Sequence, residues 1–123
     1  MNAVEQSHGA AWPDLLATRA AVLDQVREIA PLLAKHAEQA ESDRDLSRES
    51  FAALVESGAL RLFAPQRVGG LEAGYRTYVE VTVELARACG SSAWFSFILN
   101  HGDWHTGQMS AAVQEQVLSL IHI

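Results

Sequence analysis

The sequence predicts an all-α fold of about five helices without a sheet, and three observations lead to this prediction. Apolar residues recur at intervals of three and four over long stretches, which is the period of an α-helix. Ser47 and Gly58 stand where a helix would begin and end. Even the β-rich stretch near Val81 keeps its charged residues on one helical face. The 123 residues suffice for one domain with a modest core.

Composition and charge exclude several classes of protein. Hydrophobic residues make up 49% of the chain and charged residues 20%, which is typical of a soluble globular domain. A net charge of -6 argues against non-specific nucleic-acid binding, which needs a basic surface. No stretch approaches the length of an apolar membrane span. The single Cys89 excludes an internal disulfide and indicates a reducing, cytoplasmic location.

The first helix is expected from Pro13 to about Glu41, after a flexible lead-in over residues 1–13. Pro31 lies inside this stretch and should kink or divide the helix, because proline removes a backbone donor. The segment Glu41 to Asp45 reads as a polar connector. The apolar residues that share one face of the helix are Leu15, Val22, Val26, Ile29, Leu33 and Ala37.

The second helix has the clearest boundary signals. Ser47 can cap its N-terminus, and Leu46 before it can pack against Phe51. Gly58 is placed as the left-handed residue that ends the helix. Three apolar side chains are expected to form its buried face: Phe51, Leu54 and Val55.

A third helix is expected from Thr77 to Cys89. Its β-branched residues favour a strand locally, but the segment is long and Glu80, Glu84 and Arg87 are spaced as one polar face. The buried face is expected to contain Tyr78, Val79, Thr82, Val83, Leu85 and Ala86.

Two further helices are expected toward the end of the chain. Ser91 or Ser92 would cap a helix from Ala93 to about Asn100 that is apolar nearly all round, which is typical of an interior position or of a missing neighbour. Ser110 would cap the last helix. The final residues, LSLIHI, resemble tails translated from adaptor sequence. We therefore expect a domain over residues 14–118, a non-native tail over residues 119–123 and a truncated chain.

Residues that could carry catalysis do not combine into a recognised site. His101, Asp103 and His105 form an H-x-D-x-H string, but on a helix Asp103 would point away from the two histidines and no further ligand stands nearby. A triad assembled from Ser91 or Ser92 with these residues lacks a nucleophile elbow. The sequence therefore predicts no metal site and no catalytic residue within this chain.

The remaining motifs are interpreted structurally. Gly69-Gly70-Leu71-Glu72-Ala73-Gly74 matches neither the dinucleotide fingerprint nor a P-loop, so it predicts a turn with positive backbone angles. Small residues surround Cys89, which predicts a buried and unreactive thiol. Four aromatic residues could line a pocket for an aromatic ligand, or equally belong to the core or an uncovered interface: Trp94, Phe95, Phe97 and Trp104.

One ordered set of segments resembles a known family. Gly58-Ala59-Leu60 is followed by Pro65, by Gly69-Gly70, and then by Glu84 to Arg87 and Gly90-Ser91-Ser92-Ala93-Trp94. This order resembles the N-terminal helical domain of the acyl-CoA dehydrogenase superfamily. The ending ARACGSSAW is most similar to the oxygenase components of two-component flavin-dependent aromatic monooxygenases.

The resemblance implies a reaction divided between two proteins. A separate reductase would supply reduced FMN or FAD, and the oxygenase, a homo-tetramer when full length, would use it with O₂ to hydroxylate an aromatic substrate. The helix after Ala93 would face the substrate pocket, although Gly102 occupies the place where this branch often has histidine. The substrate-pocket candidates implied in this way are Ser91, Ser92, Trp94, His101 and Trp104.

Most flavin contacts in this family come from other domains, so this chain alone is expected to bind no flavin tightly and to be inactive. Two alternatives remain open on the sequence. One is an acyl-CoA dehydrogenase, whose glutamate base lies in a later part of the chain. The other is a non-catalytic helical interaction module.

Overall fold

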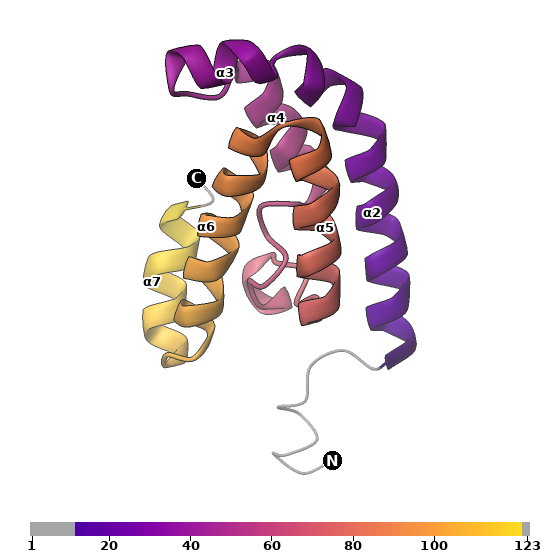
Figure 1. The fold of residues 1–123 in the computed structure, drawn as a ribbon. Helices are drawn as coiled ribbons and strands as arrows, with labels where there is room; N and C mark the ends of the chain where they lie inside the picture. Colours follow the sequence, from indigo (N-terminus) through magenta and orange to yellow (C-terminus); the bar gives the residue numbers. More distant parts are fainter. Residues whose placement is uncertain (1–11, 122–123) are drawn as a thin grey trace.

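The computed structural model describes the backbone of residues 12–121 and the side chains of residues 15–118. Over that range it is all-α, with six α-helices, one short 3₁₀ helix and no strand (Figure 1). The helices are α2 (Trp12–Lys35), α3 (Ala37–Asp43), α4 (Arg48–Ser57), η1 (Gln66–Val68), α5 (Tyr75–Ala88), α6 (Gly90–Gly107) and α7 (Ala111–Ile121). None of these helices is long and apolar enough to span a bilayer.

The predicted first helix is divided, but not at the proline. Pro31 lies inside α2 and is exposed, and the helix continues to Lys35 before a turn at His36. The carbonyl that loses its partner at a proline can be hydrated on an exposed face, so the helix tolerates the residue. α3 then extends to Asp43 and ends at Arg44, whose φ of 54° is left-handed. The expected polar connector is therefore mostly helical, and the division gives six helices rather than five.

The boundaries of α4 confirm the sequence signals, whereas its buried face does not. The Ser47 hydroxyl accepts a hydrogen bond from the Ser50 amide at 3.1 Å, and Gly58 ends the helix with a φ of 84°. Phe51 and Val55 are exposed, which corrects the predicted face. Leu54 is buried as predicted, and it is joined by Ser50, Ala53 and Ser57.

α5 is helical despite its β-branched residues, because tertiary packing outweighs local preference. It packs beside both α2 and α6 (Figure 1). Two contacting helices determine which side is buried, so Val79 and Val83 face outward, contrary to the sequence prediction. Its buried residues are Thr77, Tyr78, Val81 and Leu85.

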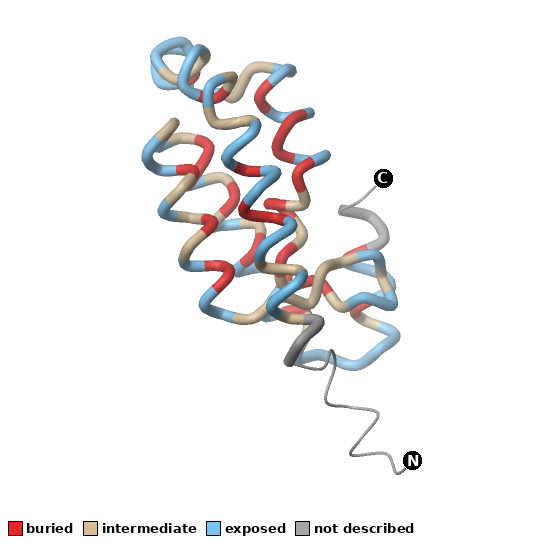
Figure 2. The backbone as a smooth tube through the Cα atoms, turned by 90° about the vertical axis from the view of Figure 1, so that its right-hand side faces the viewer, coloured by how far each residue is buried: buried red, intermediate tan, exposed pale blue. Residues whose placement is uncertain are grey.

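The core lies between the inward faces of α2, α4 and α5 and the segment that follows α4. Figure 2 shows the buried positions recurring along one side of each helix. The large, fully buried aliphatic residues of this core are Val26, Leu33, Leu54, Leu62, Val81 and Leu85. Burying such side chains contributes about 1.5–3 kcal/mol each.

The segment between α4 and α5 folds back on itself and contains η1. The Leu71 amide donates to the Arg61 carbonyl at 2.9 Å. Gly69 has a φ of 88°, which confirms the predicted turn. Gly70 is required for a different reason: a Cβ there would lie 1.9 Å from the Ala64 carbonyl oxygen.

α6 is longer than predicted and begins earlier. Its cap is Cys89, whose sulfur accepts from the Ser92 amide at 3.4 Å, rather than either serine. Cys89 is buried, as expected of a packed thiol. After α6, the Ser110 hydroxyl accepts from the Val113 amide at 3.4 Å and α7 continues to Ile121.

The proposed domain limits remain predictions. Of the lead-in predicted over residues 1–13, residues 1–11 lie outside the described residues, whereas Trp12 and Pro13 belong to α2. The side chains of residues 119–123 also lie outside the described residues. Leu118, at the predicted end of the domain, is fully buried.

Candidate functional site

The inward face of α6 is polar. The Asn100 side chain accepts from the Leu62 amide at 2.8 Å and donates to the Ala59 carbonyl at 2.7 Å. Ser96 donates to the same Ala59 carbonyl at 2.9 Å. Because these bonds are buried, removing a partner would leave an unsatisfied backbone group. The polar face of α6 therefore fixes the segment after α4.

Asp103 continues this inward face by about one turn. It is 2% exposed, and its Oδ2 atom is buried without a hydrogen-bond partner. Burial raises the pKa of the Asp103 carboxyl to about 6, while the positive charge of Arg61 acts in the opposite direction. A carboxyl that titrates near neutral pH is uncommon and requires an explanation.

The outward face of α6 carries aromatic rings and imidazoles. Trp94 stacks on Phe97 with a centroid separation of 5.6 Å, and Phe97 stacks on His101 at 5.8 Å. His101 lies 6.4 Å from Trp104, which in turn contacts His105 at 5.1 Å. Residues three and four apart lie on the same side of a helix, so the rings form a continuous row, which we call the aromatic row.

The structure brings together three of the five predicted pocket residues. Trp94, His101 and Trp104 belong to the aromatic row, and Trp94 is 65% exposed. Ser92 is fully buried, and its hydroxyl has no partner. Ser91 lies near Trp94 at the start of α6, on the wall of a cleft. By their positions, Trp94, His101 and Trp104 are therefore better placed than Ser92 to contact a substrate.

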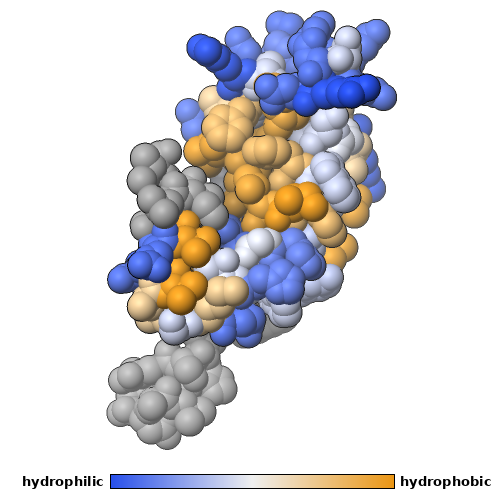
Figure 3. All heavy atoms as spheres, turned by 90° about the vertical axis from the view of Figure 1, so that its left-hand side faces the viewer, coloured by the Kyte–Doolittle hydropathy of each residue, from blue (hydrophilic) through white to orange (hydrophobic). Residues whose placement is uncertain are grey.

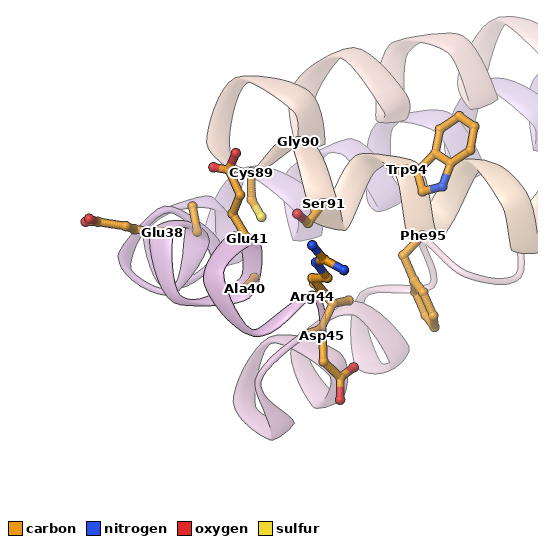
Figure 4. Close-up of a pocket in the computed structure, with 12 residues that line it drawn as sticks. Glu38, Ala40, Glu41, Arg44, Asp45, Cys89, Gly90, Ser91, Trp94 and Phe95 are labelled. Carbon is orange, nitrogen blue, oxygen red and sulfur yellow. The ribbon is translucent and has the colours of Figure 1, made fainter.

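The cleft, of about 930 Å³, lies between α3, the turn after it and the N-terminal end of α6. Figure 4 shows the Arg44 guanidinium directed toward Ser91, with Trp94 and Phe95 further along α6. Apolar groups, including Leu46, contribute to its wall. Three carboxylates also line the cleft, those of Glu38, Glu41 and Asp45.

From the sequence, Phe97 is predicted only as one of four aromatics that could line a pocket and His105 only as part of the H-x-D-x-H string, and Arg44 is not predicted at all. Phe97 and His105 complete the aromatic row, and Arg44 lines the cleft. The helical spacing of positions 94, 97, 101, 104 and 105 contains the signal for the row. This spacing is missed from the sequence because the helix is expected to end at about Asn100, before His101, Trp104 and His105. Nothing in the sequence places Arg44 beside the start of α6.

The H-x-D-x-H string lies within α6 and is divided between its two faces. His101 and His105 are exposed, with ring centroids 4.8 Å apart, whereas Asp103 faces inward. Among residues with described side chains, no group of three or more histidine, cysteine or acidic side chains is placed to hold a metal ion.

The donors in the cleft do not fit the flavin that the resemblance implies. FMN and FAD carry phosphates, which are bound by cations or by arrays of backbone amides. Here Arg44 is accompanied by three carboxylates, so the cleft would repel a phosphate more than it attracts one. The cleft therefore does not fit a flavin phosphate, and no chemical step through flavin is assigned to its residues.

A hydrophobic area covers part of the surface. Figure 3 shows it in the middle of one face, below the hydrophilic residues at the α3 end. The exposed large apolar side chains of α4 and α6 include Phe51, Val55 and Ile98. The Phe51 ring contacts Phe95 edge-on at 5.9 Å, which joins the two helices. Extended apolar surface of this kind marks interaction sites.

Comparison with known proteins agrees with this architecture. Residues 16–116 match the family described as acyl-CoA dehydrogenase, N-terminal domain. The chain is similar to the flavin-dependent monooxygenase oxygenase subunit HsaA of Rhodococcus jostii, at 32% identity over 77% of this chain and 25% of the relative. It is also similar to the oxygenase component of p-hydroxyphenylacetate 3-hydroxylase of Acinetobacter baumannii, at 34% identity over 78% of this chain and 23% of the relative.

A solved structure shows the same relationship. The crystal structure of 3-HSA hydroxylase from Rhodococcus sp. RHA1 aligns with a TM-score of 0.75 and 31% identity, over 80% of this chain and 26% of that one. The chain thus spans about a quarter of the length of the relatives it matches. The matched relatives are oxygenase components of flavin-dependent monooxygenases, as the resemblance implies. The chain belongs to the acyl-CoA dehydrogenase N-terminal domain family.

Proposed function

We propose that this chain is the N-terminal helical domain of the oxygenase component of a two-component flavin-dependent monooxygenase that hydroxylates an aromatic substrate. The observation that carries the proposal is the aromatic row: an 18-residue helix of this family's fold exposes Trp94, His101 and Trp104 while burying polar residues. Such a surface suits contact with an aromatic compound or with neighbouring protein.

The roles of the pocket residues follow from their chemistry. The exposed Trp94 and Trp104 indoles offer faces on which a planar ring can stack. The exposed His101 imidazole can exchange a hydrogen bond with a ring hydroxyl. Ser91 lies nearest the cleft, and the buried Ser92 would act only on the packing of α6. These groups would bind and orient the aromatic substrate, and the bound ring would exclude water from the aromatic row.

The cofactor and partners belong to the same proposal. Reduced FMN or FAD, delivered by a separate reductase, would supply the electrons for O₂ activation when bound to the whole oxygenase. The whole oxygenase would be a cytoplasmic homo-tetramer. The named relatives support a flavin and an oxygenase role.

A chimeric oxygenase tests the proposal. Residues 16–116 would replace the matching segment of the Acinetobacter baumannii oxygenase component, and chemically reduced FMN or FAD would be added with O₂. We expect hydroxylated product, and a loss of at least tenfold in product yield with Trp94→Ala or His101→Ala. The matched control is Leu16→Gln, an exposed apolar position on α2.

Three results would contradict the proposal. A folded chimera that forms only hydrogen peroxide with every aromatic substrate would reject the oxygenase role. Oxidation of acyl-CoA thioesters by the same chimera would favour the dehydrogenase alternative. Product yields unaffected by Trp94→Ala and His101→Ala would reject the aromatic row as a substrate surface.

A further inference from the structure

The buried Asp103 carboxylate has no role in the proposed function. It is 2% exposed and has an unpartnered oxygen, although Ser96 and Asn100 on the same side of α6 are fully engaged. Burying a charge without a partner is costly. An arrangement that keeps such a group on the inner face of a helix needs a physical explanation.

The charged group that acts on Asp103 is Arg61, from the segment after α4. The Arg61 guanidinium lies over the turn at Gly69, where its Nη2 atom would be 3.0 Å from a Cβ. No ion pair joins Arg61 to Asp103 among the residues with described side chains. Nearby on η1, Arg67 is engaged by Gln114 of α7. The charge of Asp103 is therefore only partly compensated.

The segment near Asp103 is held to itself and to α6 by a small set of bonds. The Leu71 amide donates to the Arg61 carbonyl at 2.9 Å, and the Ala73 amide donates to the Leu62 carbonyl at 2.7 Å. Asn100 fastens Leu62 to α6. Asp103 comes next along the same face of α6, where a comparable bond to the segment is missing.

We propose that Asp103 is a proton-operated latch on the segment of residues 59–73: protonated Asp103 lets this segment stay closed against α6, and ionised Asp103 loosens its Arg61–Gly69 end. The device is independent of the monooxygenase proposal, because it depends only on Asp103, Arg61 and the segment between α4 and α5.

The direction follows from linkage. Burial raises the pKa of Asp103 from 3.8 to about 6 in the closed form, whereas a solvated carboxyl in an open form titrates near its ordinary value. The closed form is therefore favoured most below about pH 4. Its equilibrium constant over the open form falls by about a hundredfold as the pH rises from about 4 to just above 6, and then stays constant. Arg61 opposes this shift, and its removal would enlarge it.

Amide hydrogen exchange of the full chain, followed by NMR between pH 5 and pH 8, tests the latch. After correction for the chemical exchange rate, we expect the Leu71 and Ala73 amides to lose about tenfold in protection across this range. Global unfolding also exposes Asp103 to water, so core amides of α5, such as those of Val81 and Leu85, should show a similar pH dependence but a higher protection at every pH. Equal protection of Leu71, Ala73 and these core amides would mean that Asp103 is exposed only by global unfolding, which would overturn the proposal.

Two variants and a control complete the test. Asp103→Asn should make the protection of Leu71 and Ala73 independent of pH, and an unchanged pH dependence in this variant would reject the latch. Arg61→Met should move the midpoint to higher pH, whereas a shift to lower pH would contradict the assigned role of Arg61. Asp24→Asn removes an exposed carboxyl from α2 and should leave the profile unchanged.

Discussion

α2 and α6, the two longest helices at 24 and 18 residues, are built in opposite ways. α2 buries Val22, Val26 and Leu33 and exposes Asp24 and Arg27. α6 buries five polar side chains, those of Ser92, Ser96, Asn100, Asp103 and Thr106. The exposed side of α6 instead carries large apolar residues, including Trp94, Ile98 and Trp104.

The difference shows that the two helices contribute in different ways. The inner face of α2 stabilises the domain by removing apolar surface from water. The inner face of α6 contributes hydrogen bonds rather than apolar area. Asn100 and Ser96 bond to the backbone of Ala59 and Leu62 and so hold the segment after α4 in one position. The outer face of α2 suits water, and the outer face of α6 suits contact with another apolar surface.

The largest expected effect on stability comes from replacing a buried polar residue of α6 by an apolar one, as on the buried face of α2. Asn100→Leu would remove the partner of the Leu62 amide and one of the two partners of the Ala59 carbonyl, which keeps its bond from Ser96. We expect the free energy of unfolding to fall by about 2–4 kcal/mol, because the buried Leu62 amide is left without a partner and leucine does not match the shape of asparagine. Urea denaturation measures this change, with the exposed Gln25→Leu on α2 as the control. A neutral Asn100→Leu would show that the polar face is dispensable.

The second effect concerns the charge inside α6. Because the folded-state pKa of Asp103 is raised to about 6, its contribution to stability is complete below about pH 4 and is lost as the pH rises through 6. Asp103→Asn should therefore increase the free energy of unfolding at pH 7.5 by about 1–3 kcal/mol, with little effect at pH 4. Denaturation at both pH values measures the difference. A larger gain at pH 4 would refute the assignment.

Periodicity in the sequence was enough to predict the helical fold, the cap at Ser47 and the left-handed Gly58, because these depend on local chemistry. It fails at Phe51 and Val79, which are apolar but exposed. Their burial is decided by which neighbouring helices are present, and this information does not lie in the local pattern. The same reason explains why Pro31 is tolerated on the exposed side of α2.

The site is predicted less completely than the fold. Trp94, His101 and Trp104 are brought together because helical spacing places them on one side of α6. Ser92 is adjacent in sequence but faces the interior, since one residue along a helix turns a side chain by about 100°. The contribution of Arg44 depends on a left-handed turn after α3 and has no local signal.

A smaller effect is expected from the outer face of α6. Of the five apolar residues from Trp94 to Leu99, Trp94 and Ile98 are exposed, so the helix does not bury them all. The chain should associate with rising concentration, and Ile98→Gln should weaken this association by up to about tenfold, through loss of apolar contact area. The control Leu16→Gln alters an apolar side chain of similar exposure on α2, 44% against 47% for Ile98.

Sedimentation velocity over a range of concentrations measures this association. Polar substitutions at the half-buried Phe95 or Phe97 should act in the same direction. A chain that stays monomeric at every concentration would show that the exposed apolar residues of α6 do not drive self-association. Equal effects of Ile98→Gln and Leu16→Gln would remove the distinction between the two helices.

The smallest expected effect is the response to flavin, which should be absent in this chain alone. The aromatic row of α6 offers rings but no cation, and Arg44 in the cleft is outnumbered by carboxylates, so a flavin phosphate finds no adequate partner. Addition of the chain at micromolar concentration should leave the fluorescence of FMN and FAD unquenched. The oxygenase component from Acinetobacter baumannii serves as the comparison under the same conditions. Saturable quenching by this chain would mean that the outer face of α6 or the cleft holds the isoalloxazine ring by stacking alone. Trp94 belongs to both the cleft and the aromatic row. Loss of quenching in Trp94→Ala would therefore place the flavin at one of these two surfaces, and unchanged quenching would place it elsewhere on the domain.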